Sequence, residues 1–279
     1  MNRAAAGGMR ESLAGGIVSG DIDRLLPDPP RFGPAVRRFD HDCFARAGHW
    51  GDATMAMTVV FEEQVEIPLN LGSLADFRRW ATSDEFPERG RIDYVAGRIE
   101  VDMSPEDFFC HGTLKTEIVG VLYRRVKRGD LGHMVTDRTR VSNVEAGLSA
   151  EPDIVFVAHA TLDSGRARLI SKAGSKPGHY VELEGAPDLV VEIVSDHSVT
   201  KDTQRLPKSY FEAGVREFWL ADARGENLVF QIHWRTASGY QTVEPDSDGF
   251  QPSAVFECGF RLDGRRNAKG EWTFDLRER

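Results

Sequence analysis

The segment 189–194 constrains the fold of this chain more than any other stretch of its sequence. It reads LVVEIV, and it is continuously apolar except for Glu192. An uninterrupted apolar run, as opposed to alternating apolar and polar residues, is typical of a strand that is buried on both faces. An isolated buried carboxylate is costly unless it is paired, neutralised or bound to a metal ion. The segment therefore predicts a central strand that carries one functional acid.

A second apolar strand supplies a partner for that acid. Residues 154–157 read IVFV, and Pro152 and Asp153 precede them directly. If the two strands are adjacent, Asp153 and Glu192 lie close together, where like charges repel unless a cation sits between them. Oxygen ligands suit Mg²⁺, with Mn²⁺ as a substitute, and such an ion supports phosphodiester hydrolysis. In the alternative interpretation, Asp153 caps the turn after proline and Glu192 meets an arginine.

The order of the predicted elements indicates an α/β fold of the α+β type, with a mixed β-sheet flanked by helices. Ser73 is placed to cap a helix, and apolar spacings of three or four residues predict longer helices at 108–127 and 202–213. Strands are predicted at 58–67, 140–142, 154–157, 189–195, 216–222 and 227–234, with a hairpin at 91–103, short strands over 240–276, and an exposed basic loop over 160–180.

Residues 1–54 differ from the rest of the chain. They contain AAAGG, AGG and LPDPP, and they show no sustained helical or alternating period. Such Gly- and Pro-rich sequence buries too little apolar surface to offset the entropy lost on ordering. We expect a disordered extension, or a start codon assigned upstream of the real one, because Met55 and Met57 stand directly before the first predicted strand. The folded domain is then expected at 55–279.

The composition narrows the class of protein. A net charge of −9 argues against a protein that coats nucleic acid, although a nuclease with local basic residues stays compatible with it. No run of about 18 apolar residues occurs, so no membrane span is expected. The three cysteines are widely spaced and include no CxxC pair, which fits free thiols in the cytoplasm and argues against a disulfide scaffold or a zinc site.

Several segments also match a known family in order and spacing. They are GRIEVDMSPE, His111 with Glu117 six residues on, EPDIVFV, APDLVVEIVS, and YFEAGV running into REFWLAD. Over about 73–262 the chain resembles the Uma-type family labelled putative restriction endonuclease, within the PD-(D/E)XK nuclease superfamily. The resemblance implies a restriction-endonuclease-like mixed sheet in which Asp153 and Glu192 hold the metal, aided by Glu117 from the long helix.

The chain departs from the superfamily signature at one position. The signature places a lysine two residues after the second acid, where this chain has Val194. Relatives of this type supply the lysine from the next helix, at the position that Leu206 occupies here. Lys201 is the preferred substitute and Lys208 the second, although Lys208 is expected to point to solvent. In the alternative interpretation, each is an ordinary solvated lysine.

Other candidates carry two interpretations each. Glu117 is a metal ligand or a solvated helix glutamate. His111 is a general base or phosphate contact, or a structural residue at the start of a helix. Asp93 joins the acidic cluster or lies at the surface. The basic run at 124–129 touches a nucleic acid or simply stabilises a helix C-terminus.

Three functions follow from these observations. The first is a Mg²⁺-dependent endonuclease that hydrolyses the phosphodiester bonds of DNA. The second is a catalytically degenerate nuclease fold that binds nucleic acid or a protein partner without cutting. The third is a partner-dependent subunit whose basic surface comes from another chain or from a homodimer.

Overall fold

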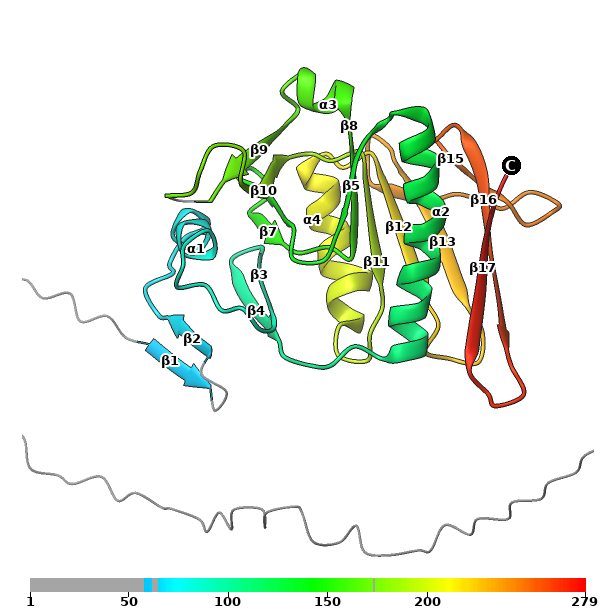
Figure 1. Ribbon diagram of the computed structural model, residues 1–279, viewed down its shortest axis with the longest axis horizontal. Coiled ribbons are helices and arrows are strands. Elements are labelled where there is room, and N and C mark those ends of the chain that lie inside the picture. The colour runs from blue at the N-terminus through cyan, green and yellow to red at the C-terminus, as the bar shows by residue number, and fades with distance from the viewer. Residues whose placement is uncertain (1–57, 62–64, 173) are drawn as a thin grey trace, which may run out of the picture. The chain divides into compact units, whose positions relative to one another are not determined.

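The computed structural model describes residues 58–61, 65–172 and 174–279 (Figure 1). The expected extension at 1–54 lies outside these residues. Within them, the predicted mixed β-sheet fold flanked by helices is confirmed, and no helix is both long enough and apolar enough to cross a bilayer.

A mixed six-stranded sheet forms the centre of the described domain, in the order β14-β13-β12-β11-β8-β5. Its strands are β5 (Gly132–Thr136), β8 (Ile154–Ala158), β11 (Leu189–Ile193), β12 (Glu217–Asp222), β13 (Val229–Arg235) and β14 (Tyr240–Thr242). Strands β11 and β12 are parallel, whereas β8 and β11 are antiparallel. The apolar strands that the sequence predicts therefore occupy the middle of this sheet.

A second six-stranded sheet has the order β4-β3-β7-β6-β10-β9. Its strands are β3 (Arg91–Val95), β4 (Arg98–Asp102), β6 (Arg140–Asn143), β7 (Leu148–Ala150), β9 (Ala167–Ser171) and β10 (Tyr180–Gly185). The predicted hairpin is β3–β4, and it turns at Ala96 and Gly97, which both have positive φ, 48° and 82°. Left-handed backbone at both central residues matches the twist of a tight hairpin.

Two smaller sheets contain the remaining strands. One pairs β1 (Thr58–Phe61) with β2 (Val65–Pro68), and the other contains β15 (Gln251–Ser253), β16 (Cys258–Arg266) and β17 (Trp272–Glu278). The sequence predicts a single strand at 58–67, but the chain forms two antiparallel strands there. The predicted exposed loop at 160–180 is also wrong in part, because it contains a short helix and strand β9, which pairs with β10.

Four α-helices are described: α1 (Leu74–Ala81), α2 (Leu114–Gly129), α3 (His159–Asp163) and α4 (Leu206–Ala213). Ser73 caps α1 as predicted, accepting a hydrogen bond from the Asp76 backbone at 3.1 Å. Helices α2 and α4 each begin in a π-helical turn, Phe108–Thr113 and Lys201–Arg205 respectively. Gly214 ends α4 with φ of 85°, a left-handed conformation that glycine adopts without strain.

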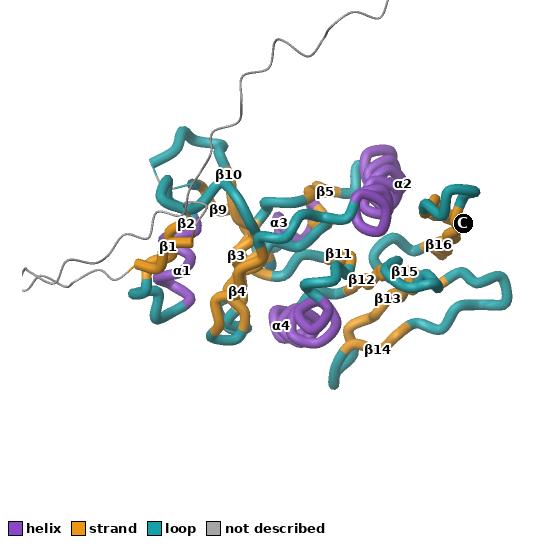
Figure 2. Tube along the Cα trace, turned by 90° about the horizontal axis from the view of Figure 1, so that it is seen from below, coloured by secondary structure: helices purple, strands orange, loops and turns teal. Residues whose placement is uncertain are grey.

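The central sheet lies between α2 and α4, which cover opposite faces (Figure 2). Along β11, Leu189, Val191 and Ile193 pack in the cluster that contains α2, whereas Val190 packs in the cluster that contains α4. Glu192 occupies the alternate position in this period of two and therefore belongs to the α4 face. The one acid of the apolar run is thereby placed under α4.

Candidate active site

Asp153 and Glu192 lie on neighbouring strands, as the sequence predicts. Val191 of β11 pairs with Ile154 of β8, so the antiparallel register places Glu192 opposite Asp153. Both side chains are fully buried, and the backbone N–H of Ile193 donates to Oδ2 of Asp153 at 2.8 Å. Two carboxylates therefore share one buried end of the central sheet.

Three cationic side chains surround Asp153. Arg91 Nη2 lies 2.7 Å from Oδ1, Lys115 Nζ lies 3.4 Å from the same oxygen, and His111 Nε2 lies 3.4 Å from Oδ2. Burial alone would raise the pKa of Asp153, but Arg91, His111 and Lys115 outweigh it and hold that pKa well below its ordinary value. Asp153 is consequently an ionised carboxylate in a dry, cationic environment.

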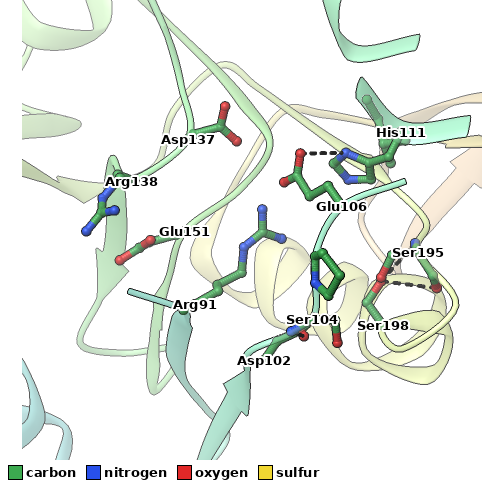
Figure 3. A pocket seen from close by; sticks show the side chains of 13 residues that line it. Arg91, Asp102, Ser104, Glu106, His111, Asp137, Arg138, Glu151, Ser195 and Ser198 are labelled. Atoms are coloured by element: carbon green, nitrogen blue, oxygen red, sulfur yellow. Dashed lines mark hydrogen bonds and ion pairs between the residues drawn. The ribbon is translucent and has the colours of Figure 1, made fainter. Parts of the chain in front are cut away.

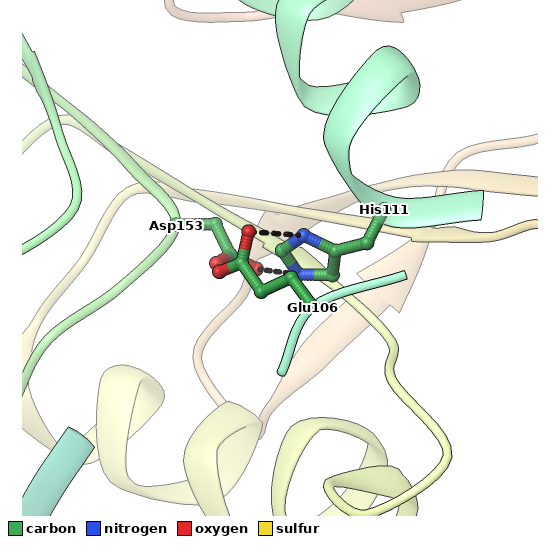
Figure 4. A group of neighbouring side chains, drawn as sticks. All are labelled: Glu106, His111 and Asp153. Carbon is green, nitrogen blue, oxygen red and sulfur yellow. Dashed lines mark ion pairs between the residues drawn. The ribbon is translucent and has the colours of Figure 1, made fainter. Parts of the chain in front are cut away.

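His111 stands between two carboxylates (Figure 4). Its Nδ1 lies 3.2 Å from Glu106 Oε2, and its Nε2 faces Asp153. Burial lowers the pKa of His111, but these two carboxylates reverse the effect and raise it to about 9. The same pairing lowers the pKa of Glu106 to about 2, with help from Lys115. The imidazole is therefore charged at neutral pH.

Glu192 has a different environment from Asp153. Its Oε1 accepts a hydrogen bond from the hydroxyl of Tyr210, and its Oε2 is buried with no hydrogen-bond partner among the described residues. Burial, and then the neighbouring charges of Asp153 and Asp202, raise the pKa of Glu192 well above its ordinary value. An unpaired buried carboxylate oxygen is costly, and either a proton or a bound cation would offset that cost.

The donor set fits a hard divalent cation. Ligand atoms of Glu106, His111 and Asp153 lie within 4.8 Å of one another, and the charged His111 would have to lose a proton to coordinate an ion. Glu192, opposite Asp153 in the strand register, adds an oxygen with no hydrogen-bond partner among the described residues. Carboxylate oxygens are the ligands that such cations prefer. Both oxygens of Asp153 are already engaged, Oδ1 by Arg91 and Lys115 and Oδ2 by the Ile193 N–H and His111, so a metal ion would displace part of this pairing.

A pocket of about 230 Å³ opens over this cluster (Figure 3). Arg91 extends into its middle, with Arg138 and Glu151 to one side and Ser195 and Ser198 to the other. Arg138 adopts a left-handed backbone with φ of 55°, next to Asp137 with φ of 34°. Left-handed conformations are strained for residues other than glycine, and they concentrate where a side chain must be aimed at a site.

Glu117 does not join the other two acids. Its Oε1 accepts a hydrogen bond from the backbone N–H of Leu276 in β17, at 2.9 Å. Glu117 follows Lys115 by two positions, which is about 200° around an α-helix. Because Lys115 faces Asp153, Glu117 points toward β17 instead, and the implied role of Glu117 as a metal ligand has no support in the geometry.

The two candidate lysines differ sharply. Lys201 is buried, and its Nζ pairs with Asp93 Oδ2 at 3.1 Å; burial opposes its charge, but Asp93 and its neighbours raise the pKa of Lys201. Lys208 is 76% exposed and lies 3.9 Å from Glu212 on the same helix. Asp93 is itself buried, so its interpretation as a surface residue is wrong. Only Lys201 belongs to the buried environment of the site.

Sequence reasoning missed Arg91, Glu106, Lys115 and Asp202. A signal existed for Lys115, since it follows His111 by four residues and therefore shares its helix face. Asp202 is buried beside Lys201, and burial is the main cause that raises its pKa to about 6. Arg91 reaches Asp153 from another sheet, and no local sequence pattern predicts such a contact.

Comparisons with known proteins bear on the family of the chain. A family model named Uma2, described as putative restriction endonuclease, matches residues 74–265, more than half of the chain. A crystal structure of a putative nuclease belonging to DUF820 from Anabaena variabilis ATCC 29413 is similar at a TM-score of 0.46 and 20% identity, over 66% of this chain and 90% of that chain. No curated protein matches the chain. The chain therefore belongs to the Uma2 family of putative restriction endonucleases.

Proposed function

We propose that this chain is an endonuclease that hydrolyses the phosphodiester bonds of DNA with Mg²⁺ as its cofactor. One observation carries the proposal: Glu192, which the strand register places opposite the ionised Asp153, has a buried oxygen with no hydrogen-bond partner among the described residues, and neighbours of this pair, Arg91 and His111, line an open pocket. A nuclease family supplies the reaction class. The same two acids that the sequence singles out thus form the chemical centre of the proposal.

Asp153 and Glu192 are the residues that would hold Mg²⁺, and Glu106 has a ligand atom within 4.8 Å of one on Asp153. A bound Mg²⁺ would lower the pKa of a water ligand and offset the charge that grows on a phosphate. Tyr210 fixes the orientation of Glu192 through its hydrogen bond to Oε1, so the free Oε2 is held in one direction. Preorganisation of this kind spares the cost of ordering the ligand later.

The cationic side chains are suited to a phosphate. Arg91, His111 and Lys115 are charged and ordered because each already faces Asp153. If Asp153 held Mg²⁺, Arg91 and Lys115 would lose part of their pairing and would be available to a phosphate oxygen. Donors fixed before the reaction stabilise developing charge without reorganising. We assign the role of the missing signature lysine to Lys201, and we assign none to the exposed Lys208.

Metal titration and DNA cleavage on the same samples test the proposal. Glu192→Gln is the decisive variant, because it keeps an acceptor for Tyr210 while it removes the charge. Wild type should bind Mg²⁺ and Mn²⁺ by calorimetry and nick a plasmid, whereas Glu192→Gln should do neither. Glu117→Gln is the matched control and should retain both properties. Failure of wild type to bind either metal at millimolar concentration would refute the metal site.

A degenerate, non-cutting nuclease fold is the second candidate, and one observation favours it. Asp153 is already neutralised by Arg91, His111 and Lys115, while Val194 and Leu206 occupy the positions where lysine is expected. This candidate predicts DNA binding that survives a metal chelator, together with no cleavage at any metal concentration. The same calorimetry and plasmid assay therefore separate the two functions.

A further inference from the structure

A second pocket adjoins the candidate active site and plays no part in the chemistry proposed above. Its volume is about 440 Å³, and it shares Glu106, His111 and Ser195 with the first pocket. Phe108 and Arg224 line the part that is not shared. Whatever occupies this second pocket is therefore in immediate reach of the groups that surround Asp153.

Phe108 is unusual among the described residues. It is 74% exposed, more than any other large hydrophobic side chain in that part of the chain. Its backbone is nevertheless fixed, because it opens the π-helical turn that Asp107 caps through the N–H groups of Phe109 and Cys110, at 2.9 and 2.5 Å. The ring of Phe109 supports it in an edge-to-face contact, with centroids 5.0 Å apart. An anchored aromatic ring is thus held in solvent at the edge of the pocket.

The charges around this pocket disfavour a phosphate there. Three carboxylates line it, those of Glu106, Asp107 and Asp196. Its cations are already engaged, His111 by Glu106 and Asp153 and Arg224 by Asp222 and Asp196. A neutral planar group whose N–H donors meet carboxylates fits such a lining better than an anion does.

The opposite side of the candidate site is lined by basic side chains. Arg138 lines the active-site pocket and also a third pocket, of about 220 Å³, into which Arg140 and Lys172 face. No ion pair engages Arg138 among the described residues, whereas Arg140 pairs with Glu151 and Lys172 with Asp84. A nucleic-acid backbone is favoured on this basic side, which leaves the aromatic side for a base.

We propose that the pocket beside Phe108 binds one unstacked nucleobase next to the scissile phosphate. The proposal rests on the proposed function, since it names the form of nucleic acid that the same site accepts. Bases in an intact duplex are stacked on both faces, so they cannot also stack on Phe108. The substrate is therefore a single strand, or a duplex such as a supercoiled plasmid in which one nucleotide is frayed or displaced from its helix.

Binding of fluorescent DNA by the full chain tests this proposal without requiring cleavage. The probe is a single-stranded oligonucleotide with one 2-aminopurine, titrated once with chelator and once with Ca²⁺, alongside a blunt duplex of the same sequence. Phe108→Ala should weaken single-strand binding by about tenfold or more, in line with the loss of one base–aromatic stack, and should reduce the quenching of 2-aminopurine. Phe108→Trp should preserve both. Tyr123→Ala, which removes a 51% exposed ring on helix α2, should leave binding unchanged.

The outcomes separate this inference from the function on which it rests. If Phe108→Ala binds the single strand as wild type does, the base pocket is refuted while the nuclease proposal stands. An equal loss for the blunt duplex would also refute it, because the contact would then not require an unstacked base. If wild type binds no DNA in either form, the proposed function fails, and the base pocket fails with it.

Discussion

The hydroxyl of Tyr210 donates a hydrogen bond to Oε1 of Glu192, which lies eighteen residues earlier in the chain. Both side chains are fully buried. The bond joins α4 to the central sheet at the one acid of its apolar strand. It is also the one hydrogen bond that holds the Glu192 carboxyl in place among the described residues, since Oε2 has no partner.

Tyr210→Phe should therefore destabilise the protein and loosen Glu192 together. Loss of the donor leaves a buried oxygen unsatisfied, which costs about 1–3 kcal/mol in the free energy of unfolding. Urea denaturation monitored by circular dichroism measures this change. Tyr123→Phe, at an exposed position, is the control and should change stability by less than about 0.5 kcal/mol. Equal stabilities for the two variants would show that the Tyr210 bond is not made in solution.

The pairing of His111 predicts how stability depends on pH in metal-free buffer. The pKa of His111 is raised from 6.5 to about 9 in the folded protein, so its contribution is fully present below 6.5 and is lost as pH rises through 9. The part lost is on the order of 3 kcal/mol. Unfolding free energies measured across this window should fall for wild type, and the His111 share of the fall should be absent in His111→Gln. His133→Gln is the control and should keep the wild-type dependence of unfolding free energy on pH. The same dependence in wild type and His111→Gln would contradict the prediction.

Lys201 and Lys208 make a matched pair for the lysine role. Lys201→Met should reduce the cleavage rate about 100-fold, the usual cost of one lost donor in an active site, while Lys208→Met should leave it unchanged. Because Lys201 also pairs with Asp93, the folded fraction of each variant must be measured first. Partial rescue by Lys201→Arg would show that the charge, rather than packing alone, is required. Equal rates for both methionine variants would remove Lys201 from the mechanism.

Glu217 should be the most sensitive acid outside the site. Its buried carboxylate accepts hydrogen bonds from Trp219 Nε1 at 2.7 Å, from Ser253 Oγ at 2.6 Å and from the backbone N–H of Ala254 at 2.7 Å. Glu217→Ala leaves these donors unpaired, and we expect a loss of roughly 3–5 kcal/mol. The exposed Glu226→Ala is the control in the same urea titration. Hydrogen exchange at Ala254 should accelerate in the variant, and unchanged protection there would contradict the assignment.

The central strand and its acid could be predicted because their signal is local. A carboxylate in a continuous apolar strand cannot be solvated without destroying the strand, so Glu192 had to be buried and functional or paired. The proximity of Asp153 followed from strand adjacency, and the register bears it out. Each of these inferences needs only neighbouring residues and the period of a strand.

The arrangement around those acids could not be predicted in the same way. Helix α2 is covered on two sides, by the central sheet and by β17, and the sequence alone does not say which side Glu117 faces. The contact of Arg91 with Asp153 depends on how the second sheet meets the first, which no spacing reveals. Local pattern therefore fixes which groups are buried, whereas their partners depend on how the sheets and helices pack.

The two π-helical turns carry residues of the candidate site, whereas the core packs against other parts of the same helices. His111 and Lys201 lie within these turns, whereas the apolar positions that pack against the sheet belong to the regular helices that follow. A π-helical turn holds one residue more than α geometry needs, as the Gly112 N–H to Asp107 carbonyl bond shows. Deleting one residue there would rotate His111 by about 100° while leaving the packed stripe of α2 in register. In each helix the regular part therefore stays packed against the sheet while its first turn can change. Single-residue insertions or deletions in that turn would reorient the site residues without repacking the domain.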